Sequence, residues 1–415
     1  MILEIFGFIG LFYVIFRFLT KLNKTIPVFE ILLVTAFIQW FLAPWMEYNN
    51  PDPHFKYFMY VDKKSYFNLI VPSLWAMLIP YSFFAKKRQD FKNLKYFDNI
   101  RLFNYGILLI GSGFLGELML PFVPSSLKFI FYLISNLKYI GAILTLIYGK
   151  STLIFHFVYS ILVFKSFQSG YFHELIIWTI FFLPFYSKRK KISVIQKPMI
   201  LIIGTLFLIF IQNIKNTYRS NLNEIGIIEN IQISSKGLDK KSVVNYDVLT
   251  RLNQGWIISA VIENVDNKNI RLNGSSIFYA IQASFLPRFL MPNKSGAGGQ
   301  QNFRLLSGLE IDDKTSMGVS LVGELYANFG LIGTIISFFL FSLLLNLFLN
   351  KLFRISKKNI LVLFFIPLIF FQVVKAETEL VVILNHLVKA SILSALIIYT
   401  INRLKLDKKI IFKNH

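Results

Sequence analysis

Residues 318–349 read GVSLVGELYANFGLIGTIISFFLFSLLLNLFL. The second half, 330–349, is a mostly apolar run of about 20 residues, which as a helix crosses a hydrocarbon core of about 30 Å. The first half carries Glu324, Tyr326 and Asn328, which a plain membrane anchor does not need. This stretch therefore predicts a membrane helix that is entered through a polar helical segment.

Spacing within the polar segment predicts how its side chains are arranged. Ser320, Glu324 and Asn328 recur every four residues, so a helix places them in one stripe. Gly330 and Gly333 follow, and glycines allow a bend and a close approach between helices. The stripe is expected to serve either as part of a site at the mouth of the span or as a polar helix cap.

The composition fits a membrane protein. Of 415 residues, 55% are hydrophobic and 17% aromatic, and the mean hydropathy is +0.56. The absence of cysteine excludes disulfides, thiolate catalysis and cysteine-ligated metals. The net charge of +22 comes from basic residues in short segments beside apolar runs, which indicates membrane topology rather than nucleic-acid binding.

Apolar runs along the chain predict an all-α polytopic membrane protein with about eleven transmembrane helices, the first retained in the mature chain. The expected spans are 2–18, 26–46, 65–85, 101–121, 127–148, 151–168, 171–187, 197–214, 330–349, 360–374 and 380–402. Basic runs at 86–95 and 187–191 must be cytoplasmic under the positive-inside rule, which places the N-terminus outside and the C-terminus inside.

The chain is expected to divide into an N-terminal transmembrane bundle (1–214), a large extracytoplasmic loop (215–329) and C-terminal transmembrane helices with a cytoplasmic tail (330–415). Apolar residues recur at three- and four-residue steps in 248–262 and 275–290. These segments predict amphipathic helices that lie on the membrane surface and roof the bundle. No internal repeat is visible, which counts against transporters built from repeated halves.

Basic residues of the large loop are candidate ligands for phosphate, because arginine matches phosphate oxygens with a planar fork. Arg288 stands out, since it lies in the apolar stretch SFLPRFLMP, where a charge needs a partner or a ligand. For any single one of the other basic residues, the alternative is an ordinary loop residue or a contact to lipid headgroups. The candidates for substrate binding are Lys215, Arg219, Arg251, Arg288, Lys294 and Arg304, with Tyr326 and Asn328 from the polar segment.

Glu324 and His386 are the candidate catalytic residues. Glu324 lies just outside the predicted span, whereas His386 lies about two turns inside the last one, where ionisable residues are functional candidates. The alternatives are a helix cap for Glu324 and a bond to a neighbouring helix for His386. Asp312 and Asp313 form a bare acidic pair without metal-ligand spacing, and we expect no metal and no cofactor.

Several segments resemble the bacterial O-antigen or oligosaccharide repeat-unit polymerases, the Wzy-like family. The matching stretches are WMEYNNPDPHFKYFMYVD (45–62), IKNTYRSN (214–221), RLNQGWIISAVI (251–262), the region of Gly274, LPRFLMPNK (286–294) and SLVGELYANFGLIG (320–333). This chain departs from the family's acidic and proline pattern around Lys294, because it reads PNKS rather than PDKP.

The resemblance implies a GT-C-like glycosyltransferase of the bacterial plasma (inner) membrane. Such an enzyme transfers a growing glycan from undecaprenyl diphosphate to the next lipid-linked repeat unit, outside the membrane and without metal. Arginines would hold the diphosphate leaving group, and a carboxylate or imidazole would take the proton of the acceptor hydroxyl. The implied partners are the undecaprenyl-diphosphate-linked glycan and membrane lipids, optionally a chain-length regulator, and no nucleic acid.

Three rival functions remain open. An O-antigen ligase-like enzyme would use the same donor with another acceptor. A flippase for lipid-linked sugars would expect repeat symmetry and charges along a central passage. A non-catalytic scaffold of a polysaccharide complex would need no site at all.

Overall fold

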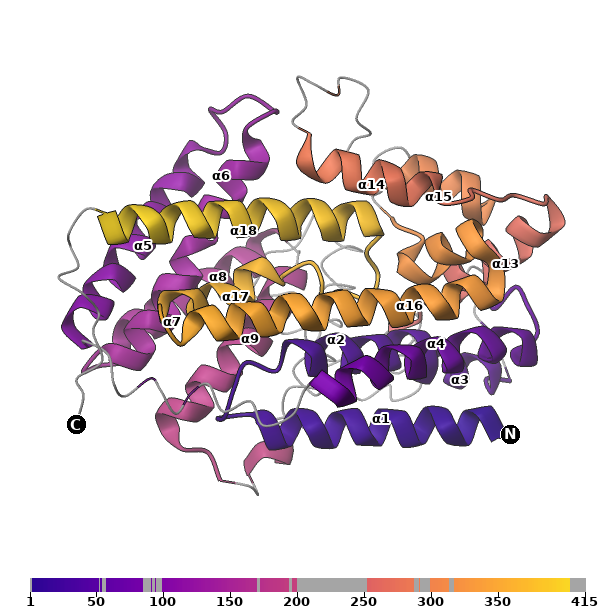
Figure 1. The fold of residues 1–415 in the computed structure, drawn as a ribbon, viewed down its shortest axis with the longest axis horizontal. Coiled ribbons are helices and arrows are strands. Elements are labelled where there is room, and N and C mark those ends of the chain that lie inside the picture. Colours follow the sequence, from indigo (N-terminus) through magenta and orange to yellow (C-terminus); the bar gives the residue numbers. More distant parts are fainter. Residues whose placement is uncertain are drawn as a thin grey trace, which may run out of the picture.

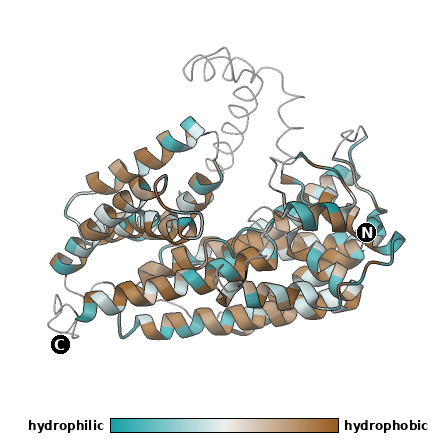
Figure 2. Cartoon of the chain, turned by 90° about the horizontal axis from the view of Figure 1, so that it is seen from above, coloured by the Kyte–Doolittle hydropathy of each residue, from teal (hydrophilic) through white to brown (hydrophobic). Residues whose placement is uncertain are grey.

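The computed structural model describes residues 2–51, 53, 57–84, 91, 94, 99–169, 172–193, 196–199, 252–286, 291, 299–312 and 317–403. Within these ranges the secondary structure is helical, and no strand occurs. Several of the long helices run along the longest axis of the molecule, and others cross it obliquely (Figure 1). They are predominantly hydrophobic (Figure 2), as expected for helices in a bilayer.

Among the described residues, seven helical segments are long and apolar enough to cross a membrane. They agree with seven of the predicted spans, so the prediction of a helical polytopic membrane protein is confirmed at this level. The segments are α1 (Ile2–Lys21), the continuous run of α2 (Val28–Ala36), η1 (Phe37–Leu42) and α3 (Ala43–Tyr48), α4 (Lys63–Phe84), α5 (Asn99–Met119), the pair α6 (Lys128–Ser135) and α7 (Leu137–Tyr148), α16 (Ser320–Ser356) and α18 (Leu380–Arg403).

The other four predicted spans differ. Helix α8 (Leu153–Ser169) is apolar but shorter, α9 (His173–Lys190) ends in three basic residues, and α17 (Leu361–Ile369) has nine residues. Most of 197–214 lies outside the described residues. The structure therefore supports a multi-pass bundle without fixing the number of crossings at eleven.

The crossing predicted as a helix over 360–374 is broken. All nine residues of α17 are buried, but the helix ends at Phe370, and turns and bends lead from there to Leu380. Within a membrane, non-helical backbone is tolerated only where protein groups or a water-filled cavity provide hydrogen-bond partners for its N–H and C=O groups. Thr35 does so here, because its hydroxyl donates to the carbonyl of Val374 at 2.8 Å.

Contacts between connections support the predicted alternation of the helices. The segments after α1, after α4, after α7 and at the end of α9 meet at one end of the bundle. The contacts are Phe91 N to Lys24 O (3.1 Å), Tyr148 Oη to Leu94 O (3.3 Å), Arg189 Nη2 to Gly149 O (2.9 Å) and Lys197 Nζ to Leu22 O (3.5 Å). These segments are the ones predicted to be cytoplasmic.

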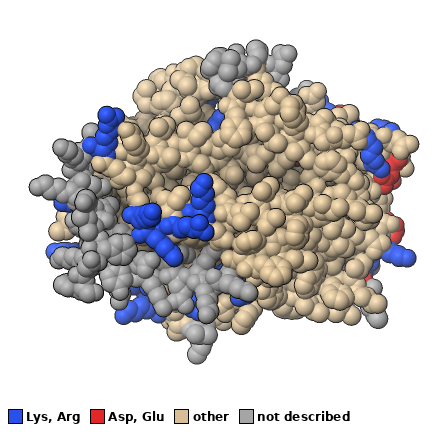
Figure 3. Space-filling view, viewed as in Figure 1, with Lys and Arg blue, Asp and Glu red and all other residues tan. Residues whose placement is uncertain are grey.

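The opposite end joins the starts of α1 and α4. Glu4 accepts from the Trp45 indole at 2.8 Å and pairs with Lys63 at 3.0 Å. Figure 3 shows Lys and Arg side chains at one end of this face, a broad belt without charge, and side chains of both signs at the other end. This distribution agrees with the predicted sidedness.

The described part of the large loop contains α13 (Gly255–Asn267), α14 (Ser275–Phe285) and α15 (Gln300–Ser307). Helix α14 lies within the predicted amphipathic segment 275–290, whereas α13 overlaps the segment 248–262 and continues beyond it to Asn267. Every residue of α13 from Gly255 to Ile262 is buried, between α15, α16 and the second membrane segment. Helix α13 is thus an integral part of the fold rather than a surface roof.

The π-helix η1 explains how α13 is held. A π-turn shifts the hydrogen-bond ladder and frees backbone carbonyls within a helix. Two of these carbonyls find partners: Gln39 O accepts from the backbone N–H of Gln254, at 3.1 Å, and Trp40 O accepts from the Tyr66 hydroxyl at 2.9 Å. The second membrane segment therefore anchors the beginning of α13 through its irregular turn.

Candidate functional site

The polar segment 320–328 is helical and bends away from the membrane span at Gly330, as predicted. Gly330 has φ 63° and ψ −164°, which interrupts α16 within its length. A β-carbon at this position would meet no atom within 4 Å, so the backbone conformation rather than space requires glycine. The bend separates the polar segment from the apolar part of α16.

Glu324 is buried and lies between two other helices. Its Oε1 accepts from the Ser276 hydroxyl at the start of α14, and its Oε2 accepts from the backbone N–H of Leu380 at the start of α18, both at 2.8 Å. Asn328 lies on the same face, where it donates to Ser276 Oγ at 2.8 Å and accepts from the N–H of Gly274 at 2.8 Å. The predicted stripe thus brings Glu324 and Asn328 together and attaches α14 to them.

Glu379, directly before α18, is the neighbouring carboxylate, and the sequence analysis missed it. Its side chain accepts from the N–H of Val319 at 3.2 Å and from the Asn302 amide of α15 at 3.1 Å. Burial, and then the negative charge of Glu324, raise the pKa of Glu379 to about 7. A carboxyl group with such a pKa can exchange a proton near neutral pH.

The carboxylate pair, Glu324 and Glu379, joins two helix starts reciprocally. Glu379 caps α16 through Val319, and Glu324 caps α18 through Leu380. Helix N-termini carry unpaired N–H groups and a partial positive charge, so they stabilise carboxylates. Across the described part of the chain, neither carboxylate forms an ion pair with a basic side chain.

Gly299 shows how closely the loop backbone passes this pair. It adopts φ 67°, and a β-carbon there would lie 2.8 Å from Glu379 Oε1. Conformation and space both exclude a side chain at this position. The backbone of the large loop at Gly299 therefore packs directly against the carboxylate of Glu379.

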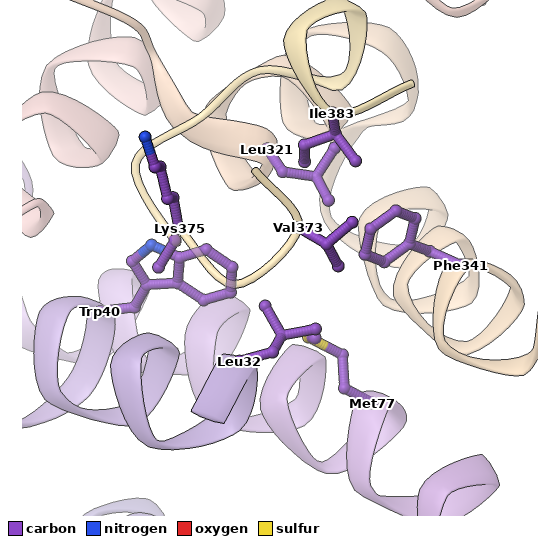
Figure 4. A pocket seen from close by; sticks show the side chains of 9 residues that line it. Leu32, Trp40, Met77, Leu321, Phe341, Val373, Lys375 and Ile383 are labelled. Carbon is purple, nitrogen blue, oxygen red and sulfur yellow. The ribbon is translucent and has the colours of Figure 1, made fainter. Parts of the chain in front are cut away.

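Lys375 lies in the irregular segment that connects α17 to α18. It lines a small cavity with room for about one water molecule, and Figure 4 shows it beside Trp40 on one edge with apolar side chains around the rest. Its ammonium lies 4.7 Å from the ring centre of Phe371. The indole N–H of Trp40 has no hydrogen-bond partner in the described structure.

His386, the second predicted catalytic residue, lies apart from Glu324. Its Nε2 is 2.8 Å from the carbonyl of Leu368, near the end of the broken helix α17, and its ring packs against Phe129 and Phe371. Leu380, which touches Glu324, precedes it by six residues, or about 9 Å of helix. This geometry matches the alternative of a histidine bonded to a neighbouring helix.

Two further candidates engage the loop itself. Tyr326 donates its hydroxyl to Asp266 of α13 at 2.8 Å, and Asp266 also pairs with Arg271 at 3.3 Å. Arg304 of α15 donates to the carbonyl of Ile311 at 2.5 Å. Tyr326 and Arg304 therefore order the loop in this structure.

The remaining substrate-binding candidates lie outside the described residues, and their role stays a prediction. They are Lys215, Arg219, Arg251, Arg288 and Lys294. Among the residues that are described, no group of three or more His, Asp and Glu side chains is placed to hold a metal ion.

Glu379 and Lys375 share one sequence signal that could have identified them. They delimit KAETE (375–379), a charged stretch between two strongly apolar runs. Such a stretch resembles an ordinary connecting turn, and only the folded chain shows that both of its ends are largely buried.

Comparisons with protein-family models, with curated proteins and with solved structures give no match for this chain.

Proposed function

We propose that this protein is a membrane glycosyltransferase that extends lipid-diphosphate-linked glycans on the extracytoplasmic side. The proposal combines the resemblance in sequence with one structural observation, the carboxylate pair. The pair lies where the large loop meets the membrane helices, at the end opposite the basic connections. A glycosyl transfer needs a proton acceptor at such a boundary, and Glu379 has a suitable pKa.

In the proposed reaction, a hydroxyl oxygen of the acceptor glycan attacks the anomeric carbon of the donor. The bond between this carbon and the lipid diphosphate breaks, and the diphosphate leaves with the bonding electrons. The hydroxyl proton passes to Glu379. Cationic side chains stabilise the leaving group, and the basic residues predicted from the loop are the candidates for this role.

This assignment moves the proton acceptor from Glu324, expected from the sequence, to its neighbour. Glu324 then acts as a positioning residue, because it holds the start of α18, directly after Glu379, and its charge raises the pKa of Glu379. Ser276 and Asn328 keep Glu324 in place.

The test is polymerisation by purified protein in liposomes that contain lipid-linked repeat units. We expect longer glycans from the wild-type protein, also in excess EDTA, and a loss of about 10²–10⁴-fold for Glu379→Gln. Binding of the lipid donor should persist in this variant. Normal polymerisation by Glu379→Gln would exclude the proposed acceptor, and a reaction that depends on added Mg²⁺ would exclude the metal-free scheme.

A flippase for lipid-linked glycans is the second candidate, and the break after Ile369 in the predicted crossing 360–374 favours it. Transporters often place binding sites at discontinuous membrane helices. A liposome assay for movement of the lipid-linked glycan between leaflets distinguishes the two. Movement without formation of longer glycans would replace the enzyme proposal by the transporter. A ligase-like enzyme would instead transfer the glycan to an acceptor other than a second repeat unit.

A further inference from the structure

Helix α14 exposes a stripe of large apolar side chains, whose contact with water would be unfavourable. Phe278, Ile281 and Phe285 are 63%, 46% and 69% exposed, and their three- and four-residue spacing places them on one face. The helix belongs to the loop predicted to be extracytoplasmic. Large exposed apolar side chains that cluster on one face indicate a surface covered by an apolar partner.

The opposite face of α14 packs along α18. It carries Ser276, Ala280 and Ser284 at four-residue spacing, and Ala280 and Ser284 are fully buried. Small residues at this spacing let helices approach closely, which is the usual way that helices associate inside membranes. Helix α14 therefore has two features of a membrane helix: small residues on the face that packs against α18, and large apolar residues on the exposed face.

The direction of α14 follows from the carboxylate pair. Ser276 and the N–H of Leu380 bind the same carboxylate, Glu324, so α14 and α18 begin side by side. The two helices then run in the same direction (Figure 1). Because α18 is a candidate membrane span that starts at Leu380, α14 enters the membrane with it, to a depth of about 16 Å over its 11 residues.

The exposed stripe also continues a surface that faces lipid. Gly274, at the start of α14, lies next to the ring of Phe329, which is 43% exposed. Directly after it, α16 exposes Ile332 and Ile336 along its membrane part. The apolar surface of α14 is therefore an extension of the membrane-facing surface of α16.

We infer that α14 is a re-entrant membrane helix, which descends beside α18 into the outer leaflet and is covered by the hydrocarbon chains of bilayer lipids. This inference holds whether the protein is an enzyme or a transporter. It also means that the large loop is not wholly extramembranous. Ser276 then connects a lipid-embedded helix directly to Glu324.

Site-directed spin labelling tests this inference, and the absence of native cysteine makes single-cysteine variants unambiguous. Labels at Phe278→Cys and Phe285→Cys are compared, in liposomes, with a lipid-facing reference at Ile336→Cys and an aqueous reference at Lys268→Cys. Collisions with oxygen report lipid, and collisions with a water-soluble nickel chelate report water. Ile281→Cys replaces either test variant if that variant fails to fold.

Both test labels should resemble the label at position 336, and the label at 285 should lie about 10 Å deeper than that at 278, because seven helical residues separate them. Accessibility to the nickel chelate, as at position 268, would overturn the inference. Protection from both reagents would show that protein covers the stripe, which also overturns it. Equal depths would show that α14 lies flat at the interface and is not re-entrant.

Discussion

Glu30 and Glu379 are both buried carboxylates, but their partners differ. Glu30 lies at the start of α2, where it pairs with Lys21 at 2.5 Å and accepts from the Tyr81 hydroxyl at 2.5 Å. Glu379 lies directly before α18 with backbone and amide donors, and the charge that acts on it is that of another carboxylate, Glu324. Lys21 balances the negative charge of Glu30, whereas Glu379 has a second acidic group, Glu324, beside it.

Glu117 is a second carboxylate of the bundle that has cations beside it. It pairs with Lys138 at 3.0 Å and also with Lys165, so the three side chains form an ion triad. Such pairs hold helices together, and removing one partner leaves an isolated buried charge. A carboxylate pair without a cation is harder to explain by stability, which is why we assign the chemistry to it.

We expect the largest effect on activity from a substitution at Glu379, and almost none from the same substitution at Glu30. Glu379→Gln keeps the size of the side chain and an oxygen for the N–H of Val319, but it cannot take a proton from an acceptor. We expect a loss of about 10²–10⁴-fold in polymerisation. Glu30→Gln is the matched control, and activity per folded molecule should stay near that of the wild type. Equal losses in both variants would remove the distinction.

The Glu30 ion pair should instead matter for stability and not for activity. Lys21→Met leaves Glu30 buried without its cation, and breaking such a pair costs about 3–5 kcal/mol in the free energy of unfolding. Denaturant unfolding of the detergent-solubilised protein measures this loss. The pH dependence of the remaining activity should not move. A shifted pH profile would mean that the ion pair also influences Glu379, the proposed proton acceptor.

The pH dependence of stability follows from the raised pKa of Glu379. Between its ordinary value of 4.5 and about 7, the folded protein binds more protons than the unfolded chain. This group's contribution to stability is therefore complete below about pH 4.5 and is lost as the pH rises through 7. The loss amounts to about 3 kcal/mol.

Thermal unfolding followed at several values between pH 5 and pH 8 measures this loss in the wild-type protein. Glu379→Gln should lack this component, because an amide does not titrate. Parallel pH curves for the two proteins would contradict the raised pKa.

A smaller effect is expected at His386. Its ring binds the carbonyl of Leu368 near the end of α17, which also accepts from the N–H of Phe371 at 3.4 Å, so the substitution removes one of two hydrogen bonds, at a cost of about 0.5–1.5 kcal/mol. His386→Leu should therefore lower the unfolding temperature while folded molecules remain active. Ser391→Ala, on the same helix, is the control with a smaller expected loss. A large loss of activity in well-folded His386→Leu would return the acceptor role to this histidine.

The sequence predicted the features that depend on local pattern. Apolar length identified seven membrane segments, glycine identified the bend at residue 330, and four-residue spacing placed Glu324 and Asn328 on one face. The break after Ile369 was not predictable in this way, because the groups that satisfy it, Thr35 and His386, lie far away in the chain.

The carboxylate pair was hidden from the sequence for the same reason. Glu324 and Glu379 are 55 positions apart, and each caps the helix that belongs to the other. No local pattern encodes such an exchange. The raised pKa of Glu379 depends on burial by α15 and on the charge of Glu324, both of which exist only after folding.

The most direct measurement is the titration of the Glu379 carboxyl group itself, by infrared difference spectroscopy of the purified protein. The signal of a protonated carboxyl group that is absent from Glu379→Gln should disappear with a midpoint near pH 7. In Glu324→Gln the midpoint should move to lower pH, because the neighbouring negative charge is removed. A midpoint near the ordinary value of 4.5 in the wild-type protein would contradict our account.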